Sequence, residues 1–480
     1  MTELITHKPA AREAVTTATS AKREPSIGDS LFICCGIIVI MLVGIVLYHI
    51  PIQVLLILAL ILTAVVSYKY GYSTAEMVEG MQSSFSRAMV AMVIFILIGC
   101  IIGAWMHSGT VPALIYYGLN LLNPKYFLPL GLIICSMTSL AIGTSWGTAG
   151  TVGLALMGIG AGLGFPAPMI AGMVISGAFF GDKMSPLSDT NNLASAAAES
   201  NIYRHILGML YTTVPAYIIC LCLYTVLGFT YATHSSVNMA EVVHIQSVLA
   251  GRFNLTPFVL LPMGILIVLM IAKVHPIPAM SCATFFGTVI DLTFQRSDIG
   301  GALGAIYSGY TQATGFKLVD AILIRGGIQS MMGTFSLAFL ALCLGGVLEK
   351  VGYVTVLIEK AIERIKSDKY MVPLVIGTTF LSNIAMGTNY MSIILNGGAY
   401  RKAFDEAGLQ RRLLSRLLEE GGTQTAALVP WSTAGAFMAG TLSVATFSYV
   451  PYSFLNWINP ILSIVLACFG IFVFRTNKPA

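Results

Sequence analysis

A polar segment, GDKMSPLSDTNNLAS (residues 181–195), interrupts a long apolar part of the chain. It holds two aspartates, Asp182 and Asp189, and one lysine, Lys183, whereas residues 80–181 before it contain no acid. A carboxylate in apolar surroundings is costly unless a proton or a cation neutralises it. If a proton and a sodium ion compete for one such carboxylate, the protein can exchange one for the other.

Asp189 is the first candidate for that shared carboxylate, and Asp182 is the second. Pro186, three residues before Asp189, disfavours a continuous helix and leaves carbonyl oxygens free. Asp182 ends an apolar run, where we expect water to enter. Four polar side chains surround Asp189 and would act as co-ligands: Ser188, Thr190, Asn191 and Asn192.

Lys183 is expected to be a charge partner of an acid rather than an ion ligand. An interfacial salt bridge is the alternative interpretation of Asp182 and Lys183, and a helix N-cap is the alternative for Asp189.

The chain repeats itself at an offset of 244 residues. KYFLPL at 125–130 returns as KYMVPL at 369–374, and TSLAIGTSWGT at 138–148 returns as SNIAMGTNYMS at 382–392. SPLSDTN at 185–191 falls on VPWSTAG at 429–435, so a neutral Thr433 replaces Asp189. Two copies of one unit, 30–228 and 256–474, follow from this pattern, and such duplication is typical of secondary transporters.

Each copy therefore contains two polar stretches that break helices: 143–148 and 181–192, then 387–392 and 425–435. Irregular backbone at membrane depth is tolerated where protein buries it or where it lines a cavity. We expect the four stretches to meet near the membrane midplane. Close helix packing, or side chains bonded to their own backbone, are the alternatives. The further candidate ion ligands are Thr144, Ser145, Thr148, Thr388, Asn389, Ser392, Ser432 and Thr433.

Composition places these stretches in a membrane protein. Of 480 residues, 56% are hydrophobic and 10% are charged, against about 25% charged in soluble domains. The apolar runs are continuous rather than alternating, which predicts an all-α polytopic fold with ten to thirteen membrane helices, broken ones included. Residues 1–29 are expected to form a disordered cytoplasmic tail, and 229–255 an external connecting loop.

The distribution of basic residues predicts the orientation. The positive-inside rule places the N-terminus and residues 401–416 inside, and residues 231–254 outside. An odd number of crossings in each copy would then make the repeats inverted. Glu419 and Glu420 end the basic amphipathic segment RRLLSRLLEE, and we expect both to be solvated.

Several classes of function are disfavoured. The nine cysteines form no Cys-x-x-Cys pair and no Cys/His cluster. The sequence contains no basic domain for nucleic acid, no Ser/His/Asp constellation and no phosphate-binding glycine loop. We therefore expect neither an enzyme nor a cofactor, and treat sodium as a transported substrate. A cation channel is the rival from another class, and broken helices around carboxylates favour alternating access over it.

Four motifs resemble blocks of the NhaC family of sodium/proton antiporters. They are GAFFGDKMSPLSDTNNLA, IGTSWGTAGTVG, IRGGIQSM and LVPWSTAGAFMAGTL, and the resemblance covers residues 30–474. It implies two inverted repeats, a scaffold and a transport domain, elevator motion and a homodimer. One departure is Asn191, where related motifs carry Thr. The Asn amide adds a hydrogen-bond donor, so an organic substrate alongside the ion remains an alternative.

The sequence thus predicts a multi-pass transporter of the inner or plasma membrane that exchanges sodium for protons within the lipid bilayer. The alternative is sodium- and proton-coupled exchange of small organic acids such as malate and lactate. The resemblance assigns the cation and the proton to Asp182 and Asp189.

Overall fold

The computed structural model describes residues 23–121, 123–234, 239–364 and 370–476. Within these ranges the chain is helical and has no β-strand beyond one isolated bridge between Leu409 and Arg475. The all-α prediction is therefore confirmed. Most of the predicted disordered tail, residues 1–22, lies outside the described residues. The first helix, α1, begins at Ile27, where the Ser26 side chain caps it by accepting from the Asp29 N–H.

Seven helices in the described ranges are long and apolar enough to cross a membrane, or up to nine if two bent pairs are each one span. This is fewer than the ten to thirteen predicted, because the broken helices are divided into pieces too short to count. The seven lie in α1 (Ile27–Val46), α2 (Ile52–Lys69), α3 (Thr74–His107), α5 (Pro124–Ile142), α10 (Ile202–His234), α13 (Pro276–Ile290) with the π-helical turn η3 (Asp291–Gln295) that continues it, and α16 (Gly327–Val351).

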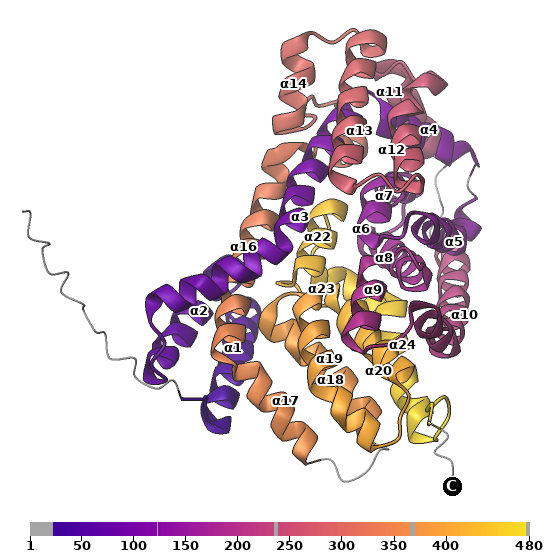
Figure 1. The fold of residues 1–480 in the computed structure, drawn as a ribbon. Helices are drawn as coiled ribbons and strands as arrows, with labels where there is room; N and C mark the ends of the chain where they lie inside the picture. The colour runs from indigo at the N-terminus through magenta and orange to yellow at the C-terminus, as the bar shows by residue number, and fades with distance from the viewer. Residues whose placement is uncertain (1–22, 122, 235–238, 365–369, 477–480) are drawn as a thin grey trace, which may run out of the picture.

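Helices α3 and α16 run side by side through the molecule (Figure 1). Small residues allow this close approach: a Cβ on Gly80 would lie 2.6 Å from the carbonyl oxygen of Gly346. Ion pairs join the same two helices, Lys350 with Glu79 and Arg87 with Glu349. One side of α3 lines the cavity described below.

Two of the predicted breaks have matching backbone geometry. Helix α5 ends at Gly143 with φ 81°, and α18 (Met371–Met386) ends at Gly387 with φ 66°. Both angles lie in the left-handed region that favours glycine. The next residues, Thr144 and Thr388, are extended, and the chain then re-enters helix in α6 (Ser145–Thr148) and α19 (Asn389–Glu406).

The other two breaks also correspond. After α8 (Ala167–Met184) the helix α9 (Asp189–Ala197) begins, capped by Ser188. In the second half, α22 (Thr433–Leu442) begins with Ser432 as its cap. The preceding pieces there are α20 (Arg411–Leu418), a π-helical turn η5 (Glu419–Thr423) and α21 (Gln424–Ala426). The two capped helices start 244 residues apart, as the repeat offset predicts.

The remaining helices surround this centre. Toward one end of the molecule in Figure 1 lie α4 (Thr110–Leu121), α11 (Met239–Arg252), α12 (Leu261–Ile271) and α14 (Ile299–Ser308). The segment predicted as a connecting loop therefore contains a helix, α11. The others are α7 (Leu154–Gly162), α15 (Lys317–Leu323), α17 (Tyr353–Glu363), α23 (Thr446–Tyr449) and α24 (Phe454–Cys468).

Candidate functional site

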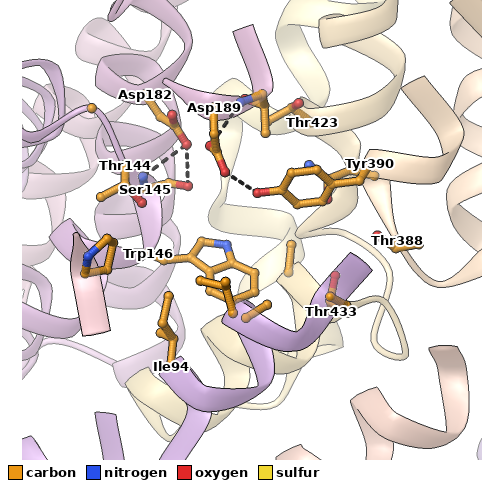
Figure 2. A pocket seen from close by; sticks show the side chains of 18 of the residues that line it. Ile94, Thr144, Ser145, Trp146, Asp182, Asp189, Thr388, Tyr390, Thr423 and Thr433 are labelled. Carbon is orange, nitrogen blue, oxygen red and sulfur yellow. Dashed lines mark hydrogen bonds between the residues drawn. The ribbon is translucent and has the colours of Figure 1, made fainter. Parts of the chain in front are cut away.

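A cavity of about 610 Å³ lies where the four broken stretches meet (Figure 2). Each stretch contributes lining residues, and α3, α16, the π-helical turn η5 and the turn between α12 and α13 contribute others. The structure thus brings the four predicted stretches together. The predicted polar residues that line it are Asp182, Asp189, Thr190, Thr144, Ser145, Thr388, Asn389 and Thr433.

Asp182 is the deeper of the two aspartates. Its side chain is 3% exposed, and its Oδ2 accepts hydrogen bonds from the backbone N–H of Ser145 at 3.0 Å and from the Ser145 hydroxyl at 2.7 Å. Its other oxygen, Oδ1, is buried and has no hydrogen-bond partner among the described residues. Asp182 therefore has one oxygen held by the break after Gly143 and one oxygen available.

Asp189 lies on the exposed side of the cavity. Its Oδ1 accepts from the Thr190 N–H at 2.9 Å, and its Oδ2 accepts from the hydroxyl of Tyr390 (Figure 2). The expectation that Asp182 lies nearer to water is wrong, because Asp189 is exposed and Asp182 is buried. The reason is that α8 continues to Met184 inside the bundle and packs closely on α5 at Gly181.

Tyr390 is a site residue that sequence reasoning missed. It lies on α19 and donates to Asp189 on α9, so one hydrogen bond joins the two halves of the chain at the cavity. The repeat pairs Tyr390 with Trp146, which also lines the cavity. The 244-residue offset between these two aromatic residues is the sequence signal from which Tyr390 could have been found.

Six predicted ligands do not line the cavity and bond to backbone or cap helices instead: Ser188, Asn191, Asn192, Thr148, Ser392 and Ser432. The Asn191 amide donates to the carbonyls of Asp182, Lys183 and Ser185 at 3.1, 2.8 and 2.8 Å. The amide donor that distinguishes Asn191 from Thr thus holds the end of α8.

Lys183 lies next to an acid, as expected, but the acid is not an aspartate. Its Nζ is 3.8 Å from Oε1 of Glu420, which also lies 3.7 Å from Nε of Arg416 and accepts from the Thr212 hydroxyl at 2.5 Å. All of these charged side chains are buried.

The prediction that Glu419 and Glu420 are solvated is wrong. Both side chains are fully buried, as is that of Arg416. The basic amphipathic segment forms helix α20 and the turn η5, and Glu420 faces Lys183 at the end of α8 rather than water. The partner is more than 200 residues away in sequence, so the segment alone gave no sign of it.

Basic side chains line another part of the cavity and were also missed. Arg87 on α3 is paired with Glu349, whereas Lys273 and His275 come from the turn between α12 and α13. Lys273 forms no ion pair within the described part of the chain. No three His, Cys, Asp or Glu side chains are grouped closely enough there to hold a metal ion.

Comparison with known proteins identifies the family. Residues 177–471 match the profile of the Na⁺/H⁺ antiporter family. A malate-2H⁺/Na⁺-lactate antiporter of Bacillus subtilis is 36% identical, with 95% of this chain and 97% of that protein covered. The arginine/ornithine antiporter ArcD of Halobacterium salinarum is also 36% identical, with 94% and 93% covered.

The Na⁺/H⁺ antiporter NhaC of Bacillus subtilis is 34% identical, with 92% of this chain and 96% of that protein covered. The relatives are transporters rather than enzymes. The chain belongs to the Na⁺/H⁺ antiporter family and is a multi-pass antiporter of the cell membrane.

Proposed function

We propose that this antiporter exchanges sodium ions for protons by alternating access, with Asp182 and Asp189 as its ion-binding carboxylates. The observation that carries the proposal is Asp182, a buried carboxylate at the cavity with one oxygen that has no partner among the described residues. Sodium is the transported substrate, and no resident cofactor is required.

Exchange follows from the cost of burying this charge. An ionised carboxylate with an unpartnered oxygen in apolar surroundings is unstable unless it binds a cation or a proton. The two neutralise the same charge, so each weakens the binding of the other. When the cavity is open to a side rich in sodium, sodium displaces the proton, and the reverse happens on the other side.

The geometry supports different roles for the two aspartates. Both oxygens of Asp189 already accept hydrogen bonds, whereas Asp182 has one oxygen to offer. We therefore assign the exchanged cation to Asp182, and propose that Asp189 attracts the cation from the exposed side of the cavity.

We also propose that the repeats 30–228 and 256–474 are inverted and that they move by an elevator motion in a homodimer. The matched left-handed angles at Gly143 and Gly387 support the repeats, as do the matched caps Ser188 and Ser432. The motion and the dimer follow from the family resemblance alone.

Purified protein in liposomes tests the exchange. A sodium gradient should drive an opposite proton movement, recorded with an enclosed pH-sensitive dye, and Asp182→Asn should abolish it. Glu79→Gln is the control, because Glu79 is an exposed acid paired with Lys350 away from the cavity. Sodium flux without coupled proton movement would indicate a channel and contradict the proposal.

A second candidate is sodium- and proton-coupled exchange of a small organic acid. The cavity volume of about 610 Å³ lies within the range of about 300–1,000 Å³ typical of sites for organic ligands. Lys273 on its wall could pair with a carboxylate. Adding malate or lactate should then stimulate exchange in the same liposomes, and Lys273→Gln should remove that stimulation while sodium/proton exchange continues.

A further inference from the structure

A group of buried charges lies behind one wall of the cavity. We call it the buried charge cluster and define it as Asp182, Lys183, Arg416, Glu419 and Glu420. Thr423, which lines the cavity, follows Glu419 by one turn of η5. The cluster therefore adjoins the cavity, because Asp182 belongs to both and Thr423 lies in the same turn as Glu419.

Glu419 forms no ion pair among the described residues, although Lys183 lies within electrostatic range and the Thr423 hydroxyl lies beside it. Both carboxylate oxygens are fully buried and form no hydrogen bond within the described residues, and neither takes part in an ion pair there. The two nearby bases, Lys183 and Arg416, contact Glu420 instead. The Thr423 hydroxyl is also buried without a hydrogen bond in the described part of the chain. Unpaired oxygens of this kind are costly, because a buried polar group normally has a partner.

The formal charge of the cluster points to the missing partner. Its three acids and two bases leave a net charge of −1 when all are ionised. A single positive charge would make the buried region neutral. Because sodium and a proton each carry one positive charge, either could supply it.

Other charged or titratable groups face the cluster from the helices packed around it, and we expect them to influence the pH dependence of cation binding. His205 Nδ1 lies within hydrogen-bond distance of the Ser415 hydroxyl, and its Nε2 of the Asn191 side-chain oxygen. The ring is given no charge in the sum above. The others are Asp189 on α9, Tyr390 on α19 and Arg412 on α20.

We propose that Glu419, with the Thr423 hydroxyl beside it, binds one monovalent cation in the transport cycle, either sodium or a proton. The inference rests on the proposed sodium/proton exchange and adds a third carboxylate to it. Asp182 and Glu419 lie within electrostatic range of each other. A cation bound at one therefore weakens binding of a cation at the other. The cluster would then bind either sodium or a proton at a given time, even though the two ions bind at different carboxylates.

Sodium titration of purified protein in detergent tests the proposal. Sodium binding is followed with radioactive sodium, and proton release is followed with a pH dye in weakly buffered solution. Wild type should bind sodium and release protons. If sodium sits at Glu419, Glu419→Gln should raise the sodium Kd by about tenfold or more. If the proton sits there, the same variant should still bind sodium, without proton release or pH dependence.

Glu79→Gln, on the exposed surface, should match wild type in both measurements. A Glu419→Gln variant with wild-type sodium affinity and wild-type proton release would overturn the assignment of Glu419 while leaving sodium/proton exchange intact. A wild type that binds no sodium, or binds it without releasing protons, would instead contradict the proposed function.

A second pair of variants covers the case in which Glu419→Gln does not fold. Thr423→Val removes the unpartnered hydroxyl and should weaken sodium binding or proton release, whereas Thr423→Ser should restore it. Sodium-induced infrared difference spectra of wild type report the loss of a protonated carboxyl, and Glu419→Asp should shift that band. No effect in Thr423→Val together with an unshifted band would overturn the proposal.

Discussion

Two aspartates only seven positions apart have opposite environments. Asp182 is enclosed by α8 and the Ser145 turn, and Asp189 faces the cavity next to Tyr390. The free-energy cost of an ionised carboxylate depends on a neutralising partner much more when the carboxylate is buried than when water solvates it. The two residues should therefore respond differently to the same substitution.

Asp182→Asn should abolish sodium-driven proton movement in liposomes, because the amide keeps the Ser145 contact but carries no charge to exchange. Asp189→Asn should retain exchange with an apparent sodium KM raised by about tenfold, the effect of losing about 1.4 kcal/mol of cation attraction. The initial rate at graded sodium concentrations measures both. Equal loss in the two variants would contradict the division of roles.

Lys183 should be a stabilising partner. Lys183→Met leaves Glu420 with less compensation in a buried site, and breaking a buried ion pair typically costs about 3–5 kcal/mol. We expect a clearly lower Tm in the absence of sodium, with unchanged selectivity for sodium over potassium in the folded fraction. A variant with a wild-type Tm and a switched substrate would refute this and favour an anion-binding role.

At the scale of elements, the 244-residue offset was enough to predict which four stretches meet, because the polar stretches with Gly143 and Pro186 recur at that offset as those with Gly387 and Pro430. It was not enough to rank the aspartates or to find Glu419. Glu420, in the turn after α20, contacts Lys183 and Thr212 in other helices, whereas an amphipathic basic segment in sequence has the same pattern as a surface helix.

The break after α5 depends on glycine, and this can be tested. Gly143 has φ 81°, and a Cβ there would lie 2.7 Å from Cβ of Leu187. Gly143→Ala should therefore destabilise the protein by at least the roughly 1–2 kcal/mol that a left-handed conformation costs, and should lower exchange by displacing Ser145.

Gly377→Ala in α18 is the matched control, since this glycine is inside a helix and a Cβ there would meet no atom of the described residues within 4 Å. Thermal unfolding of both variants in detergent provides the comparison. A Gly143→Ala protein as stable and active as Gly377→Ala would show that the tight break is not required.

At the scale of the whole molecule, both halves of the chain contribute to one cavity. Asp189 on α9 bonds Tyr390 on α19, and Lys183 on α8 contacts Glu420 beside α20. Asp189, one of the two carboxylates proposed to bind the cation, thus also takes part in a contact that joins the halves. A change in ion occupancy can therefore bias the relative position of the halves, which alternating access requires.

The most direct test of the account is the sodium affinity of wild type and Asp182→Asn from about pH 6 to about pH 9, a range that brackets a carboxylate affected by burial. Because protons compete with sodium, the wild-type apparent sodium constant should rise as pH falls, by up to about tenfold for each pH unit. Asp182→Asn should lose both sodium binding and this dependence. A sodium constant that is independent of pH in wild type, or unchanged in Asp182→Asn, would contradict the central claim.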